Sequence, residues 1–385
     1  MAHPDVVVVG AGVIGAACAE ALTARGVSVL VLDRGAPASG TTASGEGNVL
    51  VSDKEPGPEL VLAQASRRRW PTLLAELREE LGPVAEVEWE PKGGLVVATT
   101  SVAAQPLADF AAAQRGAGVD ARAITASDAA HLEPHLTKEI AAAVHYPEDA
   151  QLQPVLATTT LLAAVRKRGS EVRGAVEAVG IERHGGSVKA LRTRHSTIPC
   201  SAVINACGPW SGTFSRAAGA PIDIQPRRGV VLVTAPLPTN TVRHKVYDAD
   251  YVGAVASGEA DLQTSAVVES TQAGTVLIGS SRQRVGFDDS MRVDVLRELA
   301  RKAVRLFPIL ADAQIMRSYG GFRPYAPDHL PIIGEDHRLP GLWHATGHEG
   351  AGIGLAAATG QLLAELFTGQ APHVDPEPFR VDRRP

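Results

Sequence analysis

Residues 6–15 of this 385-residue chain read VVVVGAGVIG. A short, continuous apolar run is typical of a strand buried on both faces of a parallel sheet. The glycines that follow it, Gly10, Gly12 and Gly15, have the spacing GxGxxG. In that spacing one glycine makes a tight turn, one lets backbone N–H groups approach a pyrophosphate, and one lets the next helix pack against the strand. We therefore expect a strand, a phosphate-binding turn, and a helix over residues 13–25 whose N-terminus carries partial positive charge.

A second strand, predicted over residues 28–32, supports this interpretation. It ends at Asp33, the distance from the glycines at which an acid hydrogen-bonds a ribose hydroxyl. A glycine motif alone is weak evidence for nucleotide binding, and the alternative is a glycine-rich turn that binds no ligand. Here strand, turn, helix, strand and acid occur in order, so we expect the chain to bind a dinucleotide.

The composition is that of an ordinary globular protein with two domains, 45% hydrophobic and 21% charged. The net charge of −5 gives no reason to expect nucleic acid, and no apolar run approaches the roughly 18–20 residues that span a bilayer. The N-terminus has no basic region or cleavage site, so no signal peptide is expected. Cys18, Cys200 and Cys207 are scattered, which predicts a reducing, cytoplasmic location without a disulfide framework or a metal site.

The remaining sequence alternates helical and extended patterns. Residues 35–48 (GAPASGTTASGEGN) have the composition of a flexible linker, but their position after Asp33 favours a loop that wraps a pyrophosphate and a flavin edge. Helices are predicted over residues 58–81, 102–117, 154–168 and 291–307, and from a glycine-rich turn at 347–354 to residue 367. Strands are predicted over residues 84–90, 95–100, 171–181, 187–193, the start of 201–210, 230–234, 252–256, 266–269, 275–279 and 341–345.

Dinucleotide signals at both ends of the chain enclose β-rich insertions. This order predicts an α/β fold in which a discontinuous Rossmann-like domain binds the nucleotide. A separate α+β substrate domain is built on a mixed or antiparallel sheet. We expect the nucleotide domain to comprise residues 1–83, 144–220 and 318–385, and the substrate domain 84–143 and 221–317.

The C-terminal turn, GHEGAGIG at residues 347–354, runs straight into a helix. The N-terminus of that helix would place partial positive charge beside a reduced flavin, whose pyrimidine end is negative. The alternative is that these glycines serve only helix packing.

Five motifs occur in the order found in one family: Gly10–Gly15 with Asp33, TTAS at 41–44, NACGPWS at 205–211, GGFRP at 320–324 and ATGH at 345–348. Over nearly the whole chain they resemble the glycine/D-amino-acid oxidase family of FAD-dependent oxidoreductases. The resemblance implies FAD on the Rossmann-like domain. It also implies that FAD is non-covalent, because Arg323 occupies the position of a flavin-linking cysteine in sarcosine-oxidase relatives. The FAD contacts it implies are Gly10, Gly12, Val13, Ile14, Gly15, Asp33, Arg34, Thr41, Thr42, Ala43, Ser44, Gly47, Asn48, Ala178, Ala206, Gly208, Trp210, Gly321, Gly347, His348, Glu349, Gly350, Ala351, Gly352 and Ile353.

Arg323 is the principal candidate in the substrate site. In the glycine-oxidase branch the matching arginine pairs with the substrate carboxylate, which a guanidinium fork can grip in two places. The alternative is a structural arginine paired with an acid such as Asp328. Tyr247 and Tyr251 fall in the region that faces the substrate in the family, and one of them could serve packing alone.

Three further residues have less defined roles. His348 is expected beside the flavin ring without acid–base work. Glu349 and Asp248 are candidate general bases, although hydride transfer from a neutral amine needs no obligatory side-chain base.

Longer stretches, including GTTASGEGNVLVSDKEPGPEL and ATGHEGAGIGL, resemble the β subunits of heteromeric amine dehydrogenases. These include D-hydroxyproline dehydrogenase, opine oxidases and hydrogen cyanide synthase. The resemblance implies partner subunits with further flavin and iron–sulfur centres, because this chain has no iron–sulfur cysteine set.

We therefore expect FAD-dependent oxidation of a small amino or imino acid. The leading candidate is a D-proline-type compound such as cis-4-hydroxy-D-proline. Hydride transfer to flavin N5 would give an imine, and electrons would pass to an acceptor or to partner subunits. The alternatives are a stand-alone oxidase that uses dioxygen on glycine or D-amino acids, a flavin-binding subunit without turnover, and a nicotinamide dehydrogenase.

Overall fold

The valine run forms β1 (Val6–Val9) near the middle of a six-stranded sheet in the computed structural model, which describes residues 3–383. The strand order is β18 (Ile332–Glu335), β19 (Leu342–Thr346), β12 (Ala202–Asn205), β1, β2 (Val29–Leu32) and β8 (Glu171–Arg173). All neighbours are parallel except β18 and β19. Because a parallel sheet is covered on both faces, its strands read as apolar runs, and all four valines of β1 are buried.

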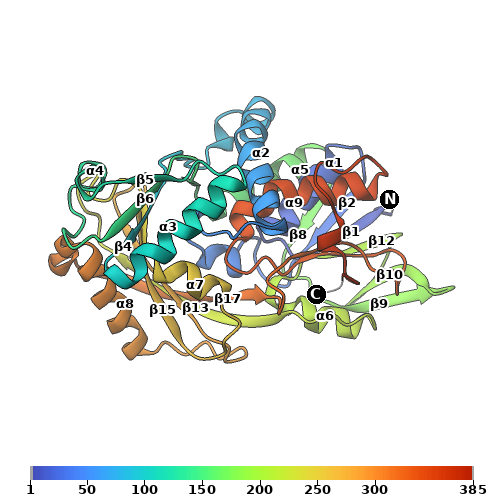
Figure 1. Ribbon diagram of the computed structural model, residues 1–385. Coiled ribbons are helices and arrows are strands. Elements are labelled where there is room, and N and C mark those ends of the chain that lie inside the picture. The colour runs from blue at the N-terminus through green and yellow to red at the C-terminus, as the bar shows by residue number, and fades with distance from the viewer. Residues whose placement is uncertain (1–2, 384–385) are drawn as a thin grey trace.

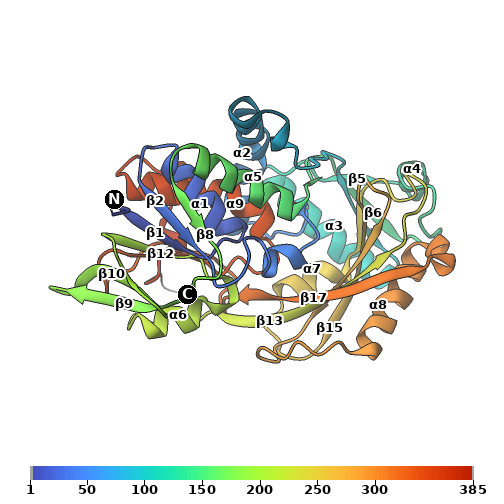
Figure 2. The ribbon, with the colours of Figure 1, turned by 180° about the vertical axis from the view of Figure 1, so that it is seen from behind.

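Alternate residues of β1 enter two different cores. In Figures 1 and 2 helices α1 (Val13–Thr23) and α9 (Gly352–Phe367) lie on one side of β1, and strands β9 (Ala178–His184) and β10 (Ser187–Thr193) lie on the other. Val6 and Val8 pack in the core that contains helices α1 and α9. Val7 and Val9 pack against a three-stranded antiparallel sheet. Its strands are β9, β10 and β11 (Thr197–Pro199). This two-residue alternation is the period of a strand.

The second half of the molecule is a mixed eight-stranded sheet (Figure 2). Its order is β17 (Ile315–Tyr325), β13 (Gln225–Thr234), β16 (Val276–Arg282), β15 (Gln263–Ser270), β14 (Lys245–Asp248), β4 (Gly94–Ala98), β6 (Ala142–Tyr146) and β5 (Arg122–Ile124). Only β14 and β4 are parallel; the other pairs are antiparallel. The two sheets and their helices confirm the predicted α/β fold with a mixed sheet.

The long strands β13 and β17 connect the halves. They pair from Gln225 opposite Tyr325 to Thr234 opposite Ile315, and Figure 2 shows them running from the eight-stranded sheet toward the other half. This pairing places Arg227 opposite Arg323.

The remaining elements complete the two halves. The other helices are α2 (Pro58–Leu81), α3 (Ser101–Gly116), α4 (Ala126–Leu132), α5 (Pro154–Lys167), α6 (Ser211–Ala217), α7 (Asp250–Ala256) and α8 (Val293–Leu306). A short pair, β3 (Asn48–Val49) and β7 (Ala150–Gln151), is antiparallel. Among residues 3–383, no helix has the length and apolar character needed to cross a membrane.

Three strand predictions were wrong. Residues 252–256 belong to α7, because a short apolar run does not distinguish helix from strand and β14 already pairs with β15 and β4. Residues 84–90 form no regular strand: a 3-10 turn covers Gly82–Ala85, and Glu88 is left-handed with φ of 53°. Residues 171–181 are divided between β8 and β9, and Ala175 between them has φ of 57°.

Two of the domain boundaries expected from the sequence fall inside strands. Residue 318 lies within β17 and residue 144 within β6, both in the eight-stranded sheet. Sheet membership favours a proposed division in which each of these strands stays whole with the substrate domain.

Candidate active site

The first three motif glycines differ in what surrounds them. Gly10 has φ of 111°, and a Cβ there would lie 2.2 Å from the Ala206 carbonyl oxygen. A Cβ at Gly15 would lie 1.9 Å from the carbonyl oxygen of Gly10. At Gly12 the nearest atom is the Thr42 hydroxyl, 3.2 Å away. Gly10 and Gly15 are therefore required by backbone packing, whereas Gly12 leaves space at the N-terminus of α1, which is where a pyrophosphate would approach.

The Asp33 carboxylate is fixed beside the same turn by hydrogen bonds from the backbone. Its Oδ2 accepts a hydrogen bond from the Ala11 backbone N–H at 2.8 Å, and its Oδ1 accepts one from the Gly35 N–H at 2.8 Å. Beside it, the Arg34 guanidinium carbon lies 3.8 Å from the centre of the Trp210 ring. The carboxylate is thus fixed at the end of β2, the position from which a ribose is bound in Rossmann-like folds.

The loop at 41–44 connects the two halves rather than acting as a flexible linker. It forms a 3-10 turn, Thr41–Ser44. The Thr42 hydroxyl accepts from the Val13 N–H at 3.0 Å, and the Thr41 hydroxyl donates to the Phe322 carbonyl at 2.6 Å. These bonds tie the start of α1 to β17.

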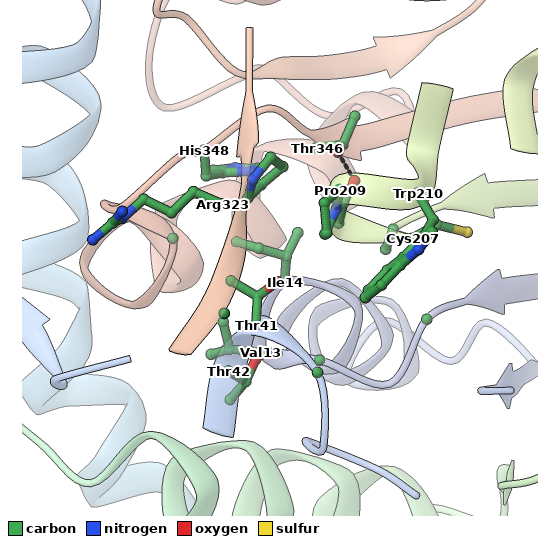
Figure 3. A pocket seen from close by; sticks show the side chains of 18 of the residues that line it. Val13, Ile14, Thr41, Thr42, Cys207, Pro209, Trp210, Arg323, Thr346 and His348 are labelled. Atoms are coloured by element: carbon green, nitrogen blue, oxygen red, sulfur yellow. Dashed lines mark hydrogen bonds between the residues drawn. The ribbon is translucent and has the colours of Figure 1, made fainter. Parts of the chain in front are cut away.

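A cavity of about 580 Å³ extends between these elements and the eight-stranded sheet (Figure 3). In Figure 3 Arg323 and Trp210 lie at opposite ends of the labelled group, with Val13, Ile14 and Thr42 between them. The structure brings nearly all the expected cofactor residues to this cavity. Gly15, Ala43, Gly347 and Ala351 do not line it. A cradle with an uncrowded glycine, a helix N-terminus and a fixed acid fits a dinucleotide.

His348 faces this cavity from the turn before α9. Its Nε2 lies 3.0 Å from the Thr359 hydroxyl, while its Nδ1 has no hydrogen-bond partner among the described residues. Burial lowers the pKa of His348 to about 3, so the ring is neutral at physiological pH. A neutral ring agrees with the expectation that His348 does no acid–base work.

Arg323 extends from β17 into the cavity wall. Its Nη1 donates to the Ser281 carbonyl at 2.8 Å, and within residues 3–383 no carboxylate lies within ion-pair distance. Burial, with repulsion from Arg282, lowers the pKa of Arg323 to about 10, so it remains a cation at neutral pH. Asp328, the alternative partner, instead pairs with Arg383 at 2.6 Å.

The two tyrosines occupy different positions. Tyr251 lines the cavity together with Arg323. Tyr247 does not line it: its ring lies behind, 4.8 Å from that of Tyr251, and its hydroxyl donates to the Ser52 hydroxyl at 2.7 Å. Tyr251 is therefore the tyrosine placed to meet a substrate.

The two candidate general bases, Asp248 and Glu349, also differ in whether they line the cavity. Asp248 lies outside the cavity and accepts from the Thr99 hydroxyl at 2.7 Å. Glu349 lines the cavity, but Arg227 at 3.2 Å and His329 at 2.8 Å hold its carboxylate. These two contacts fix the Glu349 carboxylate between a residue of β13 and His329.

Sequence reasoning missed Arg227, Arg282 and Glu46. Arg227 and Arg282 lie on β13 and β16, which reach the site through pairing with distant strands. No local motif marks them. Glu46 lies in the GEG segment after the TTAS loop. The glycines of that segment indicated a cofactor-binding loop, but no pattern in the sequence indicated a role for the acid between them.

Fold and site together define an oxidoreductase of the Rossmann-like, dinucleotide-binding class, with a substrate sheet over the nucleotide domain. Residues 5–366 match the family model described as DAO, FAD dependent oxidoreductase. The chain belongs to this family, so its dinucleotide is FAD and the nicotinamide alternative is excluded.

Individual relatives agree over almost their whole lengths. Glycine oxidase from Geobacillus kaustophilus is 29% identical, covering 98% of this chain and 97% of the relative. Hydrogen cyanide synthase subunit HcnC from Pseudomonas aeruginosa is 26% identical, covering 98% and 96%. The crystal structure of the Geobacillus kaustophilus glycine oxidase has a TM-score of 0.90 at 27% identity and covers 100% of both chains.

Proposed function

We propose that the protein oxidises a small amino or imino acid whose carboxylate is bound by Arg323. The observation that carries this proposal is a partly buried guanidinium, without a carboxylate partner in residues 3–383, at the wall of the FAD cavity. A buried cation is costly unless a counter-charge completes it. The carboxylate of an amino acid would supply that counter-charge. The glycine oxidase and HcnC relatives support the same class of substrate.

In this proposal the residues that line the cavity have separate roles in positioning the substrate. Arg323 fixes the plane of the carboxylate, which restricts where the α-carbon lies. Tyr251 closes the adjacent wall, and β13 and β17 cover the cavity. When bound, FAD would supply the two-electron acceptor for the α-carbon hydride; loss of that hydride leaves an iminium, and release of the N–H proton to solvent gives the imine.

Within this class, a D-proline-type imino acid such as cis-4-hydroxy-D-proline is the proposed substrate. The resemblance to β subunits of heteromeric amine dehydrogenases supports it, and the HcnC relative is itself named as a subunit. We propose partner subunits with flavin and iron–sulfur centres as the electron acceptors. Free thiols at Cys18, Cys200 and Cys207 support the proposed reducing, cytoplasmic location.

An anaerobic titration tests this function. The purified protein with its FAD is mixed with glycine, sarcosine, D-proline, cis-4-hydroxy-D-proline, D-alanine and an opine while the visible flavin band is followed. We expect cis-4-hydroxy-D-proline or D-proline to bleach the band. Bleaching by glycine alone would overturn the imino-acid assignment, and a band that none of them bleaches would overturn the proposed substrate class.

Admitting air afterwards separates the second candidate, a stand-alone oxidase. The full-length likeness to glycine oxidase favours that candidate. An oxidase would recover its colour within seconds in air, whereas we expect slow recovery from a dehydrogenase that passes electrons to partner subunits.

A further inference from the structure

Glu46 is a buried carboxylate in the wall of the same cavity. It follows the 3-10 turn Thr41–Ser44, and only 9% of its side chain is exposed. Its Oε2 accepts a hydrogen bond from the Asn48 side-chain amide at 3.3 Å. Its Oε1 accepts none from the described residues. The backbone of β16 covers this oxygen without donating to it, since a Cβ at Gly279 would lie 2.3 Å away.

The nearby lysine does not fully compensate Glu46. Lys245 Nζ lies 3.7 Å from Glu46 Oε2 but only 3.1 Å from Glu269 Oε2, and it donates to the side-chain amide oxygen of Asn48, Oδ1, at 2.5 Å. The Lys245 ammonium is thus shared by two carboxylates, and that of Glu46 is the farther of the two. A buried carboxylate that shares its nearby cation is incompletely compensated, and a ligand N–H that reaches it from the cavity would offset part of that cost.

Glu46 and Arg323 share the cavity. Both side chains line its wall, and the negative charge of Glu46 acts to raise the pKa of Arg323 against the larger lowering effect of burial. A cation and an anion on the walls of one cavity match the carboxylate and the amine of an amino acid.

We propose that Glu46 accepts a hydrogen bond from the amine N–H of the substrate while Arg323 holds its carboxylate. The inference rests on the proposed function and deepens it: the pocket selects for an amine as well as a carboxylate. A carboxylic acid without an N–H would bind to Arg323 alone.

Two aromatic acids test this directly, because neither can be oxidised at an α-carbon C–H. Pyrrole-2-carboxylate carries a ring N–H next to its carboxylate, and furan-2-carboxylate has an oxygen in that place. Binding is measured from the perturbation of the flavin spectrum. We expect the wild-type protein to bind pyrrole-2-carboxylate about 10-fold or more tightly than furan-2-carboxylate.

Glu46→Leu removes the acceptor. We expect this variant to bind the two acids within about twofold of each other, with the affinity for furan-2-carboxylate changed less than threefold. Glu46→Gln keeps the shape and a neutral acceptor, so an intermediate preference of about threefold is expected; it also tests the proposal if the leucine variant does not fold. Glu269→Gln is the matched control, because Glu269 contacts the same lysine without lining the cavity, and it should keep the full preference.

The outcomes separate the two proposals. Equal binding of both acids to the wild-type protein, or a preference that survives Glu46→Leu, would overturn the role of Glu46 while leaving carboxylate binding intact. Failure of both acids to bind, together with no bleaching in the amino-acid titration, would overturn the proposed function and this inference with it.

Discussion

Arg323→Met is expected to lower kcat/KM for carboxylate-bearing substrates about 100-fold, which corresponds to roughly 2.7 kcal/mol of lost transition-state binding. Among residues 3–383, only Nη1 of this guanidinium is hydrogen-bonded within the protein, to the Ser281 carbonyl. The remaining donors are left to the cavity. Methionine keeps much of the side-chain volume but can neither neutralise nor orient a carboxylate. The rate of anaerobic flavin reduction as a function of substrate concentration measures the loss.

The same substitution should leave FAD content and thermal stability nearly unchanged. Arg323 has no carboxylate partner among residues 3–383, so its removal leaves no buried acid unpaired and relieves a desolvation cost. Arg227→Met is the contrasting control. Arg227 holds Glu349 at 3.2 Å and donates to the Ser257 carbonyl at 2.8 Å, so its loss should cost ~3–5 kcal/mol of folding stability. Unchanged turnover of carboxylate substrates by Arg323→Met would show that the arginine is structural.

The local signals in the sequence predicted the nucleotide half well. The strand–turn–helix unit from Val6 to Thr23 is encoded within one short segment, where Gly10 and Gly15 each have a steric reason to be glycine. Helix α2 was predicted at its observed bounds because Pro58 begins it and Gly82, with φ of 71°, follows its last residue. In both cases neighbouring residues determine the backbone, so no distant contact is needed.

The substrate half was predicted less well because its structure depends on non-local pairing. Strand β17, IMRSYGGFRPY, contains two adjacent glycines and a proline, which are poor strand formers. Its extended backbone is maintained by register with β13 along almost its whole length. The sequence could therefore indicate Arg323 through a family motif but could not place Arg227 or Arg282 beside it.

Tyr247 illustrates the same limit within the candidate site. From the sequence, Tyr247 and Tyr251 were equally good candidates for substrate contact, because they have the same side chain and lie in the same region of the chain. The structure separates them because β14 turns Tyr247 toward Ser52 in the core, whereas the start of α7 turns Tyr251 toward the cavity. The helix in place of the strand predicted over residues 252–256 therefore bears on which tyrosine lines the cavity.

Gly12→Ala is expected to weaken FAD binding about 10- to 100-fold, or ~1.4–2.8 kcal/mol, while the protein still folds. A methyl group at this position meets only the Thr42 hydroxyl, at 3.2 Å, a tight contact that a small shift of that side chain would relieve. It would occupy the open side of the turn where backbone N–H groups at the start of α1 approach the pyrophosphate. Flavin released per mole of protein, and the Kd from titration of apoprotein with FAD, measure the effect.

Two further glycine variants distinguish lost FAD binding from lost folding. Gly10→Ala forces a Cβ to within 2.2 Å of the Ala206 carbonyl at φ of 111°, so it should lower the thermal stability of the apoprotein as well as FAD binding. Gly116→Ala, at the end of α3 with nothing within 4 Å of the added Cβ, should alter neither. The decisive pattern is an apoprotein melting temperature that falls for Gly10→Ala alone, with FAD affinity lost in both motif variants. If Gly12→Ala bound FAD as tightly as wild type, the pyrophosphate could not lie against the first turn of α1, and the ligand would have to occupy the cavity in another orientation.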